Sequence, residues 1–394
     1  MSKSSNYSHG EIFQAERCRS SFDPQISSRT YFISGFDPRG AAHYKRLFQL
    51  ELRTLGWRLG KSFSTEFMTR WTLDQTDGGL TSSPSDFCFL HWDDIARSNW
   101  PRSPLLILWQ YAGVAWFYLF RGRLFHLANL CPGVALCGAY PLLFIAFSFC
   151  LACLSIPLTI AALKVFTGLQ LIQLFSGVLV GLGVLYFAWK LGNKLGIAWL
   201  TRSILFTHRL GQLRDVDLRQ RIKEFADQLM MLEIKEPSLD ITLVGHSSGS
   251  FVLAMLAAEL HRRPDAAFLL TRIKLLTLGQ NIANLAVYPK AQFFRDDLQE
   301  LTTAPRIPWR DVTSSQDFLC YAGVNPYSSC GLPIPIGEPY PQMETVDFAK
   351  ARGLTKMWDL MSNQFDLHFD YLRNISTGVG LFEQLTLRTK LSEL

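Results

Sequence analysis

The stretch "DITLVGHSSGSFVLAMLAAEL", Asp240 to Leu260, decides the expected fold because two kinds of secondary structure meet inside it. Its first part, Ile241 to Val244, is apolar and β-branched, which is typical of a short buried strand. The second part, Ser248 to His261, is apolar and rich in alanine, which indicates a buried helix. Gly-His-Ser-Ser-Gly, 245–249, joins the two, so we expect a sharp strand-to-helix turn there.

Ser247 lies at the centre of this turn. In a sharp turn from a strand to a helix, the central residue has a strained backbone, and its side chain rises above the sheet edge. We expect Gly245 and Gly249 to lack side chains because the strand and the helix leave no room for them. The helix N-terminus that follows favours negative charge, so Ser247 is a candidate nucleophile. The alternative is an ordinary serine in a tight turn.

Short apolar strands alternate with helices on both sides of this stretch. This alternation predicts an α/β fold, in which a mostly parallel sheet is flanked by helices on both faces. Further strands are expected at Arg29–Phe36, Ser85–Ile95, Ile273–Leu278 and Trp309–Thr313, and helices at Ala41–Leu55 and Asp217–Leu232.

Two long uncharged blocks interrupt the alternation, one from Leu127 to Leu163 and one between Lys164 and Lys190. Each block can hold the roughly 20 apolar residues that cross a bilayer. We expect spans at Val134–Ile156 and Phe166–Trp189, with Lys164 in the short connection because a lysine is costly at a bilayer centre. The prediction is a two-helix transmembrane hairpin. The alternative is a buried helical pair in a large soluble core.

The residues around the hairpin predict how it is oriented. Cytoplasmic loops carry an excess of Lys and Arg, which predicts that both ends of the hairpin face the cytoplasm. An aromatic-rich helix at Pro104–Phe120 is short for a span and suits the membrane interface. The formal net charge of +6 fits a body that lies against an anionic leaflet. The basic residues are Arg97, Arg102, Arg121 and Arg123 before the hairpin, and Lys190, Lys194, Arg202 and Arg209 after it.

The simplest organisation is one α/β domain made of both flanks, with the membrane hairpin inserted between them. A polar tail at 1–28 has no apolar core of a signal peptide. The first part of the domain is expected at 29–100, the interfacial helix and hairpin at 101–200, and the second part, with the turn at Ser247, at 201–394.

Several function classes lack their motifs in this sequence. It contains no Gly-rich phosphate loop, no dinucleotide fingerprint and no paired Cys/His spacing for a metal. Basic residues are not interleaved with aromatic ones in the manner of nucleic-acid binding. We therefore expect no cofactor, no metal and no nucleic-acid partner. Cys131, Cys137, Cys150 and Cys153 lie in or beside the first apolar block and are interpreted as small apolar residues in a reducing cytoplasm.

The strand, turn and helix around Ser247 resemble the α/β-hydrolase superfamily, in its serine esterase and lipase branch. The resemblance implies an oxyanion hole built from two backbone N–H groups. One belongs to the residue after the nucleophile, here Ser248. The other comes from the loop after an early strand, here Ser34-Gly35-Phe36, so Phe36 is the matching donor. Many members have a histidine in that loop, and this chain does not.

The resemblance also implies the chain order serine, acid, histidine. Among the 8 histidines, only His368 lies downstream of the strand that should carry the acid. A neutral imidazole near pH 7 can take the serine proton and return it to a leaving group. We expect the His368 ring within hydrogen-bond reach of Ser247 Oγ, about 2.6–3.2 Å or somewhat longer without substrate. The alternative is a surface helix residue.

Three aspartates are candidates for the acid that orients the imidazole. Asp317 follows the strand Trp309–Thr313 in a loop, which is where such a carboxylate is needed. Asp311 lies within that strand and is favoured less. Asp366 is interpreted as a solvated residue at a helix start.

Other polar residues carry weaker signals. Asp93 and Asp94 are interpreted as a helix start rather than a paired-carboxylate site. Arg39 is placed in a solvated loop, with an anion contact near the pocket as the alternative. His43 and Tyr44 are expected to pack, although they could line the pocket.

These observations favour a membrane-anchored serine hydrolase that cleaves an ester or thioester through an acyl-enzyme. Its expected partners are the lipid bilayer and a hydrophobic acyl substrate, because a tether at the bilayer favours lipid-like esters. Two alternatives stay open: acyl transfer by the same residues, and an inactive hydrolase-like scaffold. The loop Phe318–Pro341 is a candidate cover of the site.

Overall fold

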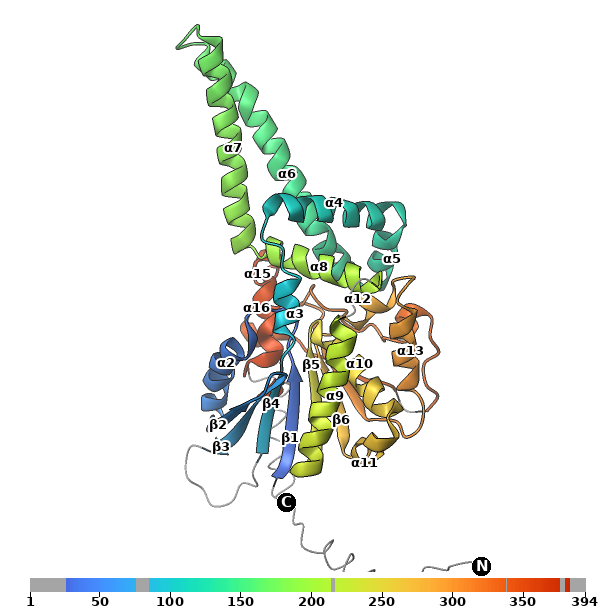
Figure 1. Cartoon of the computed structure of the whole chain (residues 1–394). Helices are drawn as coiled ribbons and strands as arrows, with labels where there is room; N and C mark the ends of the chain where they lie inside the picture. The colour runs from blue at the N-terminus through green and yellow to red at the C-terminus, as the bar shows by residue number, and fades with distance from the viewer. Residues whose placement is uncertain (1–25, 76–84, 214–216, 338, 376–379, 383–394) are drawn as a thin grey trace, which may run out of the picture.

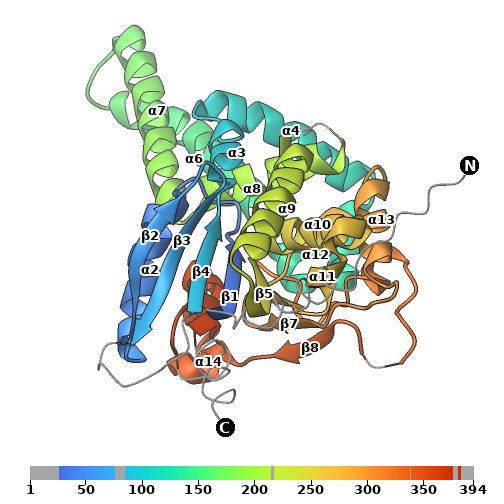
Figure 2. The same ribbon diagram turned by 60° about the horizontal axis from the view of Figure 1, so that its bottom comes forward.

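The core of the chain is an eight-stranded sheet with the order β2-β3-β4-β1-β5-β6-β7-β8. The structure, a computed structural model, describes residues 26–75, 85–213, 217–337, 339–375 and 380–382. Figure 2 shows the strands side by side, with β2 at one edge and β8 at the other. The strands are β1 (Ile26–Ile33), β2 (Trp57–Ser64), β3 (Met68–Gln75), β4 (Ser85–Leu90), β5 (Ser238–His246), β6 (Ile273–Leu278), β7 (Trp309–Thr313) and β8 (Gln342–Thr345).

Six of these strands, from β4 across β1 to β8, run parallel. β2 and β3 form an antiparallel hairpin at the β4 edge. The prediction of a mostly parallel sheet is therefore confirmed, and β6 and β7 coincide with the expected strands. Because parallel strands end at the same edge, the loops after β1, β5, β6 and β7 come together at the carboxyl edge.

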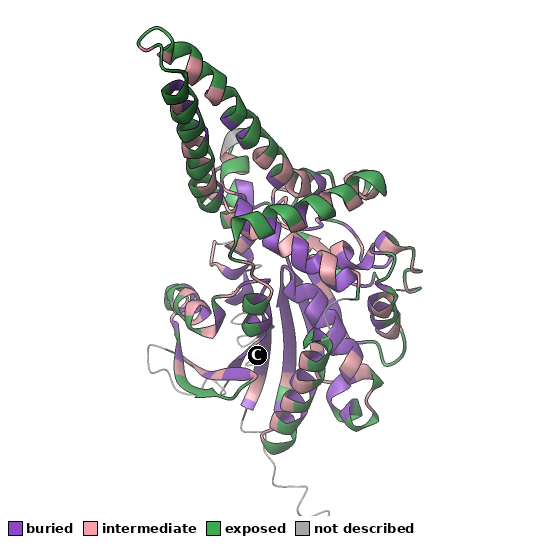
Figure 3. Ribbon diagram, turned by 45° about the horizontal axis from the view of Figure 1, so that its top comes forward, coloured by how far each residue is buried: buried purple, intermediate pink, exposed green. Residues whose placement is uncertain are grey.

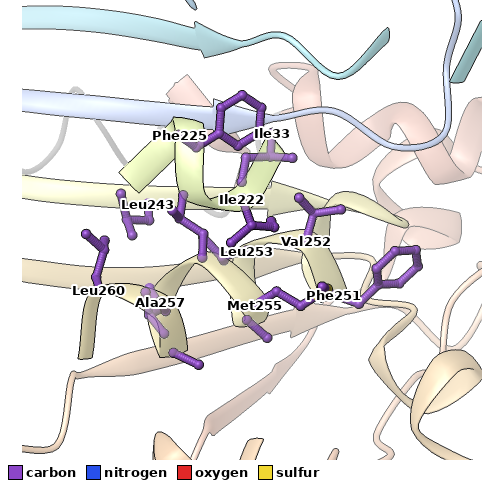
Figure 4. Close-up of a cluster of buried hydrophobic side chains, with 14 of the residues drawn as sticks. Ile33, Ile222, Phe225, Leu243, Phe251, Val252, Leu253, Met255, Ala257 and Leu260 are labelled. Atoms are coloured by element: carbon purple, nitrogen blue, oxygen red, sulfur yellow. The ribbon is translucent and has the colours of Figure 1, made fainter. Parts of the chain in front are cut away.

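Helices cover both faces of the sheet and divide its core in two. One face packs α9 (Asp217–Lys235), α10 (Gly249–Arg262) and α13 (Gln292–Glu300), and the other packs α2 (Gly40–Thr54) and α16 (Gln364–Phe369). Successive residues of β1 point to opposite faces: Tyr31 and Ile33 join the first core, and Phe32 joins the second. Figure 4 shows α10 held in this core by side chains such as Val252 and Leu253.

Three expectations are corrected by the structure. The strand expected at Ser85–Ile95 ends at Leu90, and α3 (Asp93–Ser98) follows with two aspartates in its first turn, where the helix dipole favours them. The predicted boundary at 28/29 falls inside β1, and the boundary at 200/201 falls inside α8 (Ile197–Gly211). The other helices are α11 (Ala267–Leu270), α12 (Ile282–Ala286), α14 (Phe348–Arg352) and α15 (Met357–Ser362).

The two apolar blocks form α6 (Pro132–Leu163) and α7 (Gln170–Lys194), which are long and apolar enough to cross a membrane. Their most apolar windows have mean hydropathies of 2.3 and 2.0, and only 11% and 17% of these windows is buried. A buried pair in a soluble core does not fit this exposure. Figures 1 and 3 show the hairpin projecting from the carboxyl edge of the sheet with exposed sides. Lys164 directly follows α6, in the expected connection.

A layer of three helices separates this hairpin from the sheet (Figure 1). It consists of α4 (Pro104–Phe120), α5 (Arg123–Leu130) and α8. An apolar cluster that includes Tyr111, Val114 and Leu205 joins α4 to α8, and Leu142 of α6 packs against it. The helices at the base of the apolar hairpin are thus packed on the same body that carries the turn at Ser247.

Candidate active site at the carboxyl edge of the sheet

The turn between β5 and α10 holds Ser247 in a left-handed backbone conformation. Its φ is +56°, which is unfavourable for a residue with a side chain. The turn is fixed by the Ser247 N–H, which donates to Leu278 O at 2.9 Å. The Ser247 residue is 7% exposed and contributes to the wall of a cavity. The sequence therefore builds the strained strand-to-helix turn that was expected.

Close packing explains both glycines that flank this turn. A Cβ atom on Gly245 would lie 2.6 Å from the carbonyl oxygen of Gly249. One on Gly249 would lie 2.3 Å from the carbonyl oxygen of Ile33 in β1. These distances leave no space for a side chain, which confirms the reason inferred from the sequence.

His368 and Asp317 form a buried pair next to the cavity. The His368 Nδ1 atom lies 2.7 Å from Asp317 Oδ2, and the side chains are 1% and 0% exposed. A carboxylate at Nδ1 fixes the proton there and leaves Nε2 with the lone pair. The second oxygen of Asp317 accepts the N–H of Leu319 at 2.9 Å. The imidazole is therefore oriented by a carboxylate that is itself held by the backbone.

Ser247 and His368 line the same cavity, which has a volume of about 100 Å³. The Ser247 hydroxyl accepts a hydrogen bond from Asn281 Nδ2 at 3.2 Å. Within the described residues, no hydrogen bond joins this hydroxyl to the His368 ring. The structure thus brings the two side chains to one cavity but pairs the serine with Asn281. Sequence reasoning missed Asn281, which lies directly after β6 at the shared strand edge.

The other two acid candidates lie elsewhere. Asp311 is buried within β7, where its Oδ1 atom accepts from Thr277 Oγ1 at 2.6 Å. Burial raises the pKa of the Asp311 carboxyl to about 7. Asp366 forms an ion pair of 3.0 Å with Arg373, and its side chain is half exposed. Asp317 is the candidate that contacts His368.

A second histidine, His246, supports the main chain of His368. Its Nε2 atom lies 2.8 Å from the carbonyl oxygen of His368, and the ring centroids are 5.0 Å apart. Burial, followed by the nearby His368, lowers the pKa of His246 to about 3. His246 is therefore neutral, and its Nε2–H donates to that carbonyl. The sequence signal for this role is that His246 directly precedes Ser247 in the turn. The prediction from the sequence considered only histidines downstream of the acid strand and therefore missed it.

The loop after β1 lies directly against the nucleophile candidate. A Cβ atom on Gly35 would be 3.0 Å from Ser247 Cβ and 3.3 Å from its Oγ. Within the described residues, the N–H groups of Phe36 and Ser248 donate no hydrogen bond. Both are backbone donors in segments that meet at Ser247, as an oxyanion hole requires.

This loop is held from both sides by aromatic residues. Trp92 Nε1 donates to the Ser34 carbonyl at 3.0 Å, and Trp199 Nε1 donates to the Phe36 carbonyl at 2.9 Å. The Phe36 ring stacks on Phe206 with the centroids 4.7 Å apart. Phe206 and Trp199 belong to α8, so the helix that follows the hairpin fixes the loop next to Ser247.

The loop that carries Asp317 is also fixed by neighbouring elements. The Phe318 N–H donates to Gln364 Oε1 of α16 at 2.6 Å, and Gln364 Nε2 donates to Gln316 O at 2.9 Å. A Cβ atom on Gly133, in the first turn of α6, would be 2.8 Å from the Phe318 ring. Phe318 and Leu319 are the residues of the expected covering loop that line the cavity.

The remaining candidates make structural contacts. Arg39 pairs with the buried Asp37 at 2.5 Å, and the Tyr44 hydroxyl donates to Asp37 at 3.2 Å. Asp93 pairs with Arg97 within α3. Asp94 pairs with Arg221 at 2.7 Å, and His43 lines a second, open cleft beside Arg39 rather than the cavity at Ser247. Within the described ranges, no three His, Cys, Asp or Glu side chains are grouped to hold a metal ion.

Comparisons with protein-family models, with curated proteins and with solved structures found no match.

Proposed function

We propose that the protein is a serine hydrolase of α/β-hydrolase type that cleaves an ester or thioester through an acyl-enzyme. The main support is the convergence at one cavity of a strained serine and a buried histidine that is paired with a carboxylate. These residues come from segments far apart in the chain, which are brought together at the carboxyl edge of the parallel strands. A serine in a simple tight turn needs neither partner.

Each group has a defined step in this mechanism. Ser247 Oγ attacks the acyl carbon while His368 Nε2 takes the hydroxyl proton. Asp317 stabilises the resulting imidazolium, and the N–H groups of Phe36 and Ser248 bind the oxyanion. The proton then passes to the leaving group, which departs and leaves the acyl-enzyme. Water, deprotonated by His368, releases the acid and restores the serine.

In the proposed mechanism, the hydrogen bond from Asn281 to the Ser247 hydroxyl belongs to the state of the enzyme before substrate binds. Serine–histidine contacts are often long without substrate and tighten only in the complex. A rotation of the Ser247 side chain exchanges the Asn281 amide for His368 Nε2. Asn281 then remains as a donor at the cavity wall.

The proposal includes anchoring by α6 and α7 in a membrane, with the hydrolase body on the cytoplasmic side. Its support is the length, hydropathy and exposure of the two helices, together with the basic residues on both flanks. The strongly exposed Leu171, Phe175 and Phe187 of α7 would lie against lipid.

The test is hydrolysis of acyl esters in oxygen-labelled water by the purified full-length protein in detergent. We expect wild type to release a labelled acid, and Ser247→Ala and His368→Ala to lose this activity. An unlabelled acyl group attached to an acceptor other than water would instead indicate acyl transfer. If the Ser247→Ala variant is as active as wild type, or if no acyl compound reacts with wild type, the proposed function is wrong.

A further inference from the structure

We infer that the inserted helices form a pocket for the part of a long acyl chain next to its carbonyl group, and that this chain enters from the bilayer. The substrate class is then a membrane-resident acyl ester. This inference rests on the proposed function of Ser247 and deepens it. The residues that line the cavity divide into a mostly polar group from the α/β body and a mostly apolar group from the inserted helices.

The floor of the cavity is polar and belongs to the α/β body. Its polar residues are Ser247, Asn281, Asn284 and His368, and Phe318 and Leu319 of the same body also line the cavity. Each of these residues lies in or after the loops at the carboxyl edge of the sheet. Such a floor suits the carbonyl end of an ester, where a few placed polar groups fix orientation.

The walls are mostly apolar, and most of them belong to the inserted helices. Side chains of α4, α5, α6 and α8 contribute them, so the helices that adjoin the membrane segment enclose the space above the serine. These residues include Val114, Leu119, Leu124, Leu127, Val134 and Leu142.

The outer side of this wall is apolar as well. In α4, Tyr111 and Val114 face the cavity region and are 4% exposed, whereas Leu105 and Trp109 on the same helix are 78% and 79% exposed. Figure 3 shows exposed residues along both the hairpin and α4, which lies at the hairpin base. A bilayer around α6 would therefore reach the outer face of the pocket wall without an intervening polar layer.

The chemistry of the wall selects a chain rather than a headgroup. Each methylene moved from water into such a pocket gains a factor of about four in binding. The second cleft differs in charge: Asp37, Arg39, Asp366 and Arg373 line it together with apolar side chains, whereas among the described residues no Asp, Glu, Lys or Arg lines the cavity at Ser247. Trp199 lines both spaces. A saturated chain attached to the ester therefore meets an uncharged, mostly apolar surface on the side of the inserted helices.

Gly138 of α6 gives a direct test. It lines the cavity, and its carbonyl accepts the Tyr111 hydroxyl at 2.9 Å. A Cβ atom there would meet nothing within 4 Å, so a larger side chain has open space to occupy. Gly113 of α4 is the matched control, because its Cβ would also meet nothing within 4 Å although it does not line the cavity.

The experiment compares palmitoyl and butyryl esters, presented in phosphatidylcholine vesicles and in detergent, for wild type, Gly138→Leu and Gly113→Leu in the full-length protein. We expect Gly138→Leu to lower the palmitoyl-to-butyryl ratio of kcat/KM by roughly tenfold or more, since a leucine displaces two or more methylenes. Gly113→Leu should keep the wild-type ratio. Wild type should prefer palmitoyl ester that is supplied in vesicles.

A short-tailed fluorophosphonate that still labels Ser247 shows that Gly138→Leu is folded. The inference is overturned if a labelled Gly138→Leu protein keeps the wild-type ratio, or if Gly113→Leu shifts it equally. If wild type hydrolyses palmitoyl ester in detergent as fast as in vesicles, or faster, entry of the chain from the bilayer is overturned. Absence of Ser247-dependent turnover of any ester is a different result, because it removes the proposed function itself.

Discussion

Ser247 has a strained backbone conformation, and its side chain is accessible from the cavity. Its positive φ is imposed by glycine-sized gaps at Gly35, Gly245 and Gly249, which bring strand, helix and loop together around it. Such a conformation costs about 1–3 kcal/mol and persists only where the surroundings enforce it. A turn with no chemical role would be more stable with glycine at this position.

That reasoning gives a prediction for Ser247→Gly. We expect the free energy of unfolding to rise by about 1 kcal/mol while activity is lost, because glycine adopts a positive φ without strain. Thermal unfolding in detergent measures the first effect and ester hydrolysis the second. Ser250→Gly, in the first turn of α10, should instead destabilise, since the Ser250 hydroxyl bonds Ser247 O at 2.6 Å. A destabilised Ser247→Gly protein would argue against stored strain.

The pairing of Asp317 with His368 predicts a large effect of Asp317→Asn. An amide at Nδ1 favours the wrong tautomer of the imidazole, so kcat should fall about 10³–10⁴-fold, as in serine proteases. Steady-state kinetics on a butyryl ester provide the measurement. Asp311→Asn is the matched control and should leave kcat close to wild type, because Asp311 bonds Thr277 instead of His368. Equal losses in the two variants would contradict the assignment.

Asp311 itself makes stability depend on pH. Burial raises the pKa of its carboxyl from the ordinary 3.8 to about 7, so the folded state holds a proton that the unfolded state releases between these values. Stability from this group is complete below pH 4 and is lost as pH rises to about 7. At pH 8, Asp311→Asn should therefore stabilise the fold, by at most about 4 kcal/mol, with little gain at pH 4. Unfolding curves of wild type and Asp311→Asn at both pH values measure this gain in stability. A larger gain at pH 4 than at pH 8 would contradict the prediction.

The order of the site residues was predictable from the sequence, but their neighbours were not. Ser247, Asp317 and His368 follow from a turn motif, a strand end and a count of histidines. Asn281 and His246 act through contacts between segments that are distant in the chain, at 3.2 Å to Ser247 and 2.8 Å to the carbonyl oxygen of His368. Only the strand order places those segments together, and a single sequence does not state that order.

At the scale of elements, long apolar segments were found and short edge strands were missed. α4 coincides with its prediction, and the apolar blocks each form one helix. β8 has only 4 residues, none of them buried, and half of β2 is a run of exposed residues. Such strands are specified by pairing with a neighbour rather than by an apolar pattern. α8 was missed because its arginines resemble the basic flank of a membrane span.

The hairpin depends on small residues in α7. A Cβ atom on Gly177 would be 3.0 Å from the Ile156 carbonyl, and one on Gly181 would be 3.1 Å from the Ile156 side chain. Close approach of this kind stabilises helix pairs in lipid. We expect Gly177→Leu to destabilise the protein by about 1–3 kcal/mol through overpacking. Thermal unfolding in lipid nanodiscs tests it against Gly183→Leu, which has nothing within 4 Å of its Cβ and should behave as wild type.

At the scale of the whole molecule, the insertion and the α/β body form one unit around the cavity. The first turn of α6 packs on Phe318, α8 holds the loop at Phe36, and the cavity wall comes from both parts. Removing the hairpin should therefore open the pocket as well as remove the proposed membrane anchor.

The proposed topology makes a prediction about accessibility. An epitope inserted after Gly168, in the connection between α6 and α7, should lie on the opposite side of the membrane from one inserted at Gly353, which follows α14. Antibody binding to sealed vesicles of known orientation measures both. Epitopes accessible from the same side would contradict a pair of spans.

The central claim is tested most directly by mapping where a fluorophosphonate attaches to the full-length protein. Mass spectrometry of the digested wild type should find the adduct on Ser247, and Ser247→Ala should carry none. Ser362→Ala, which changes an exposed serine of α15, should label like wild type. An adduct on another residue, labelling that persists in Ser247→Ala, or a wild type that does not react would contradict the account.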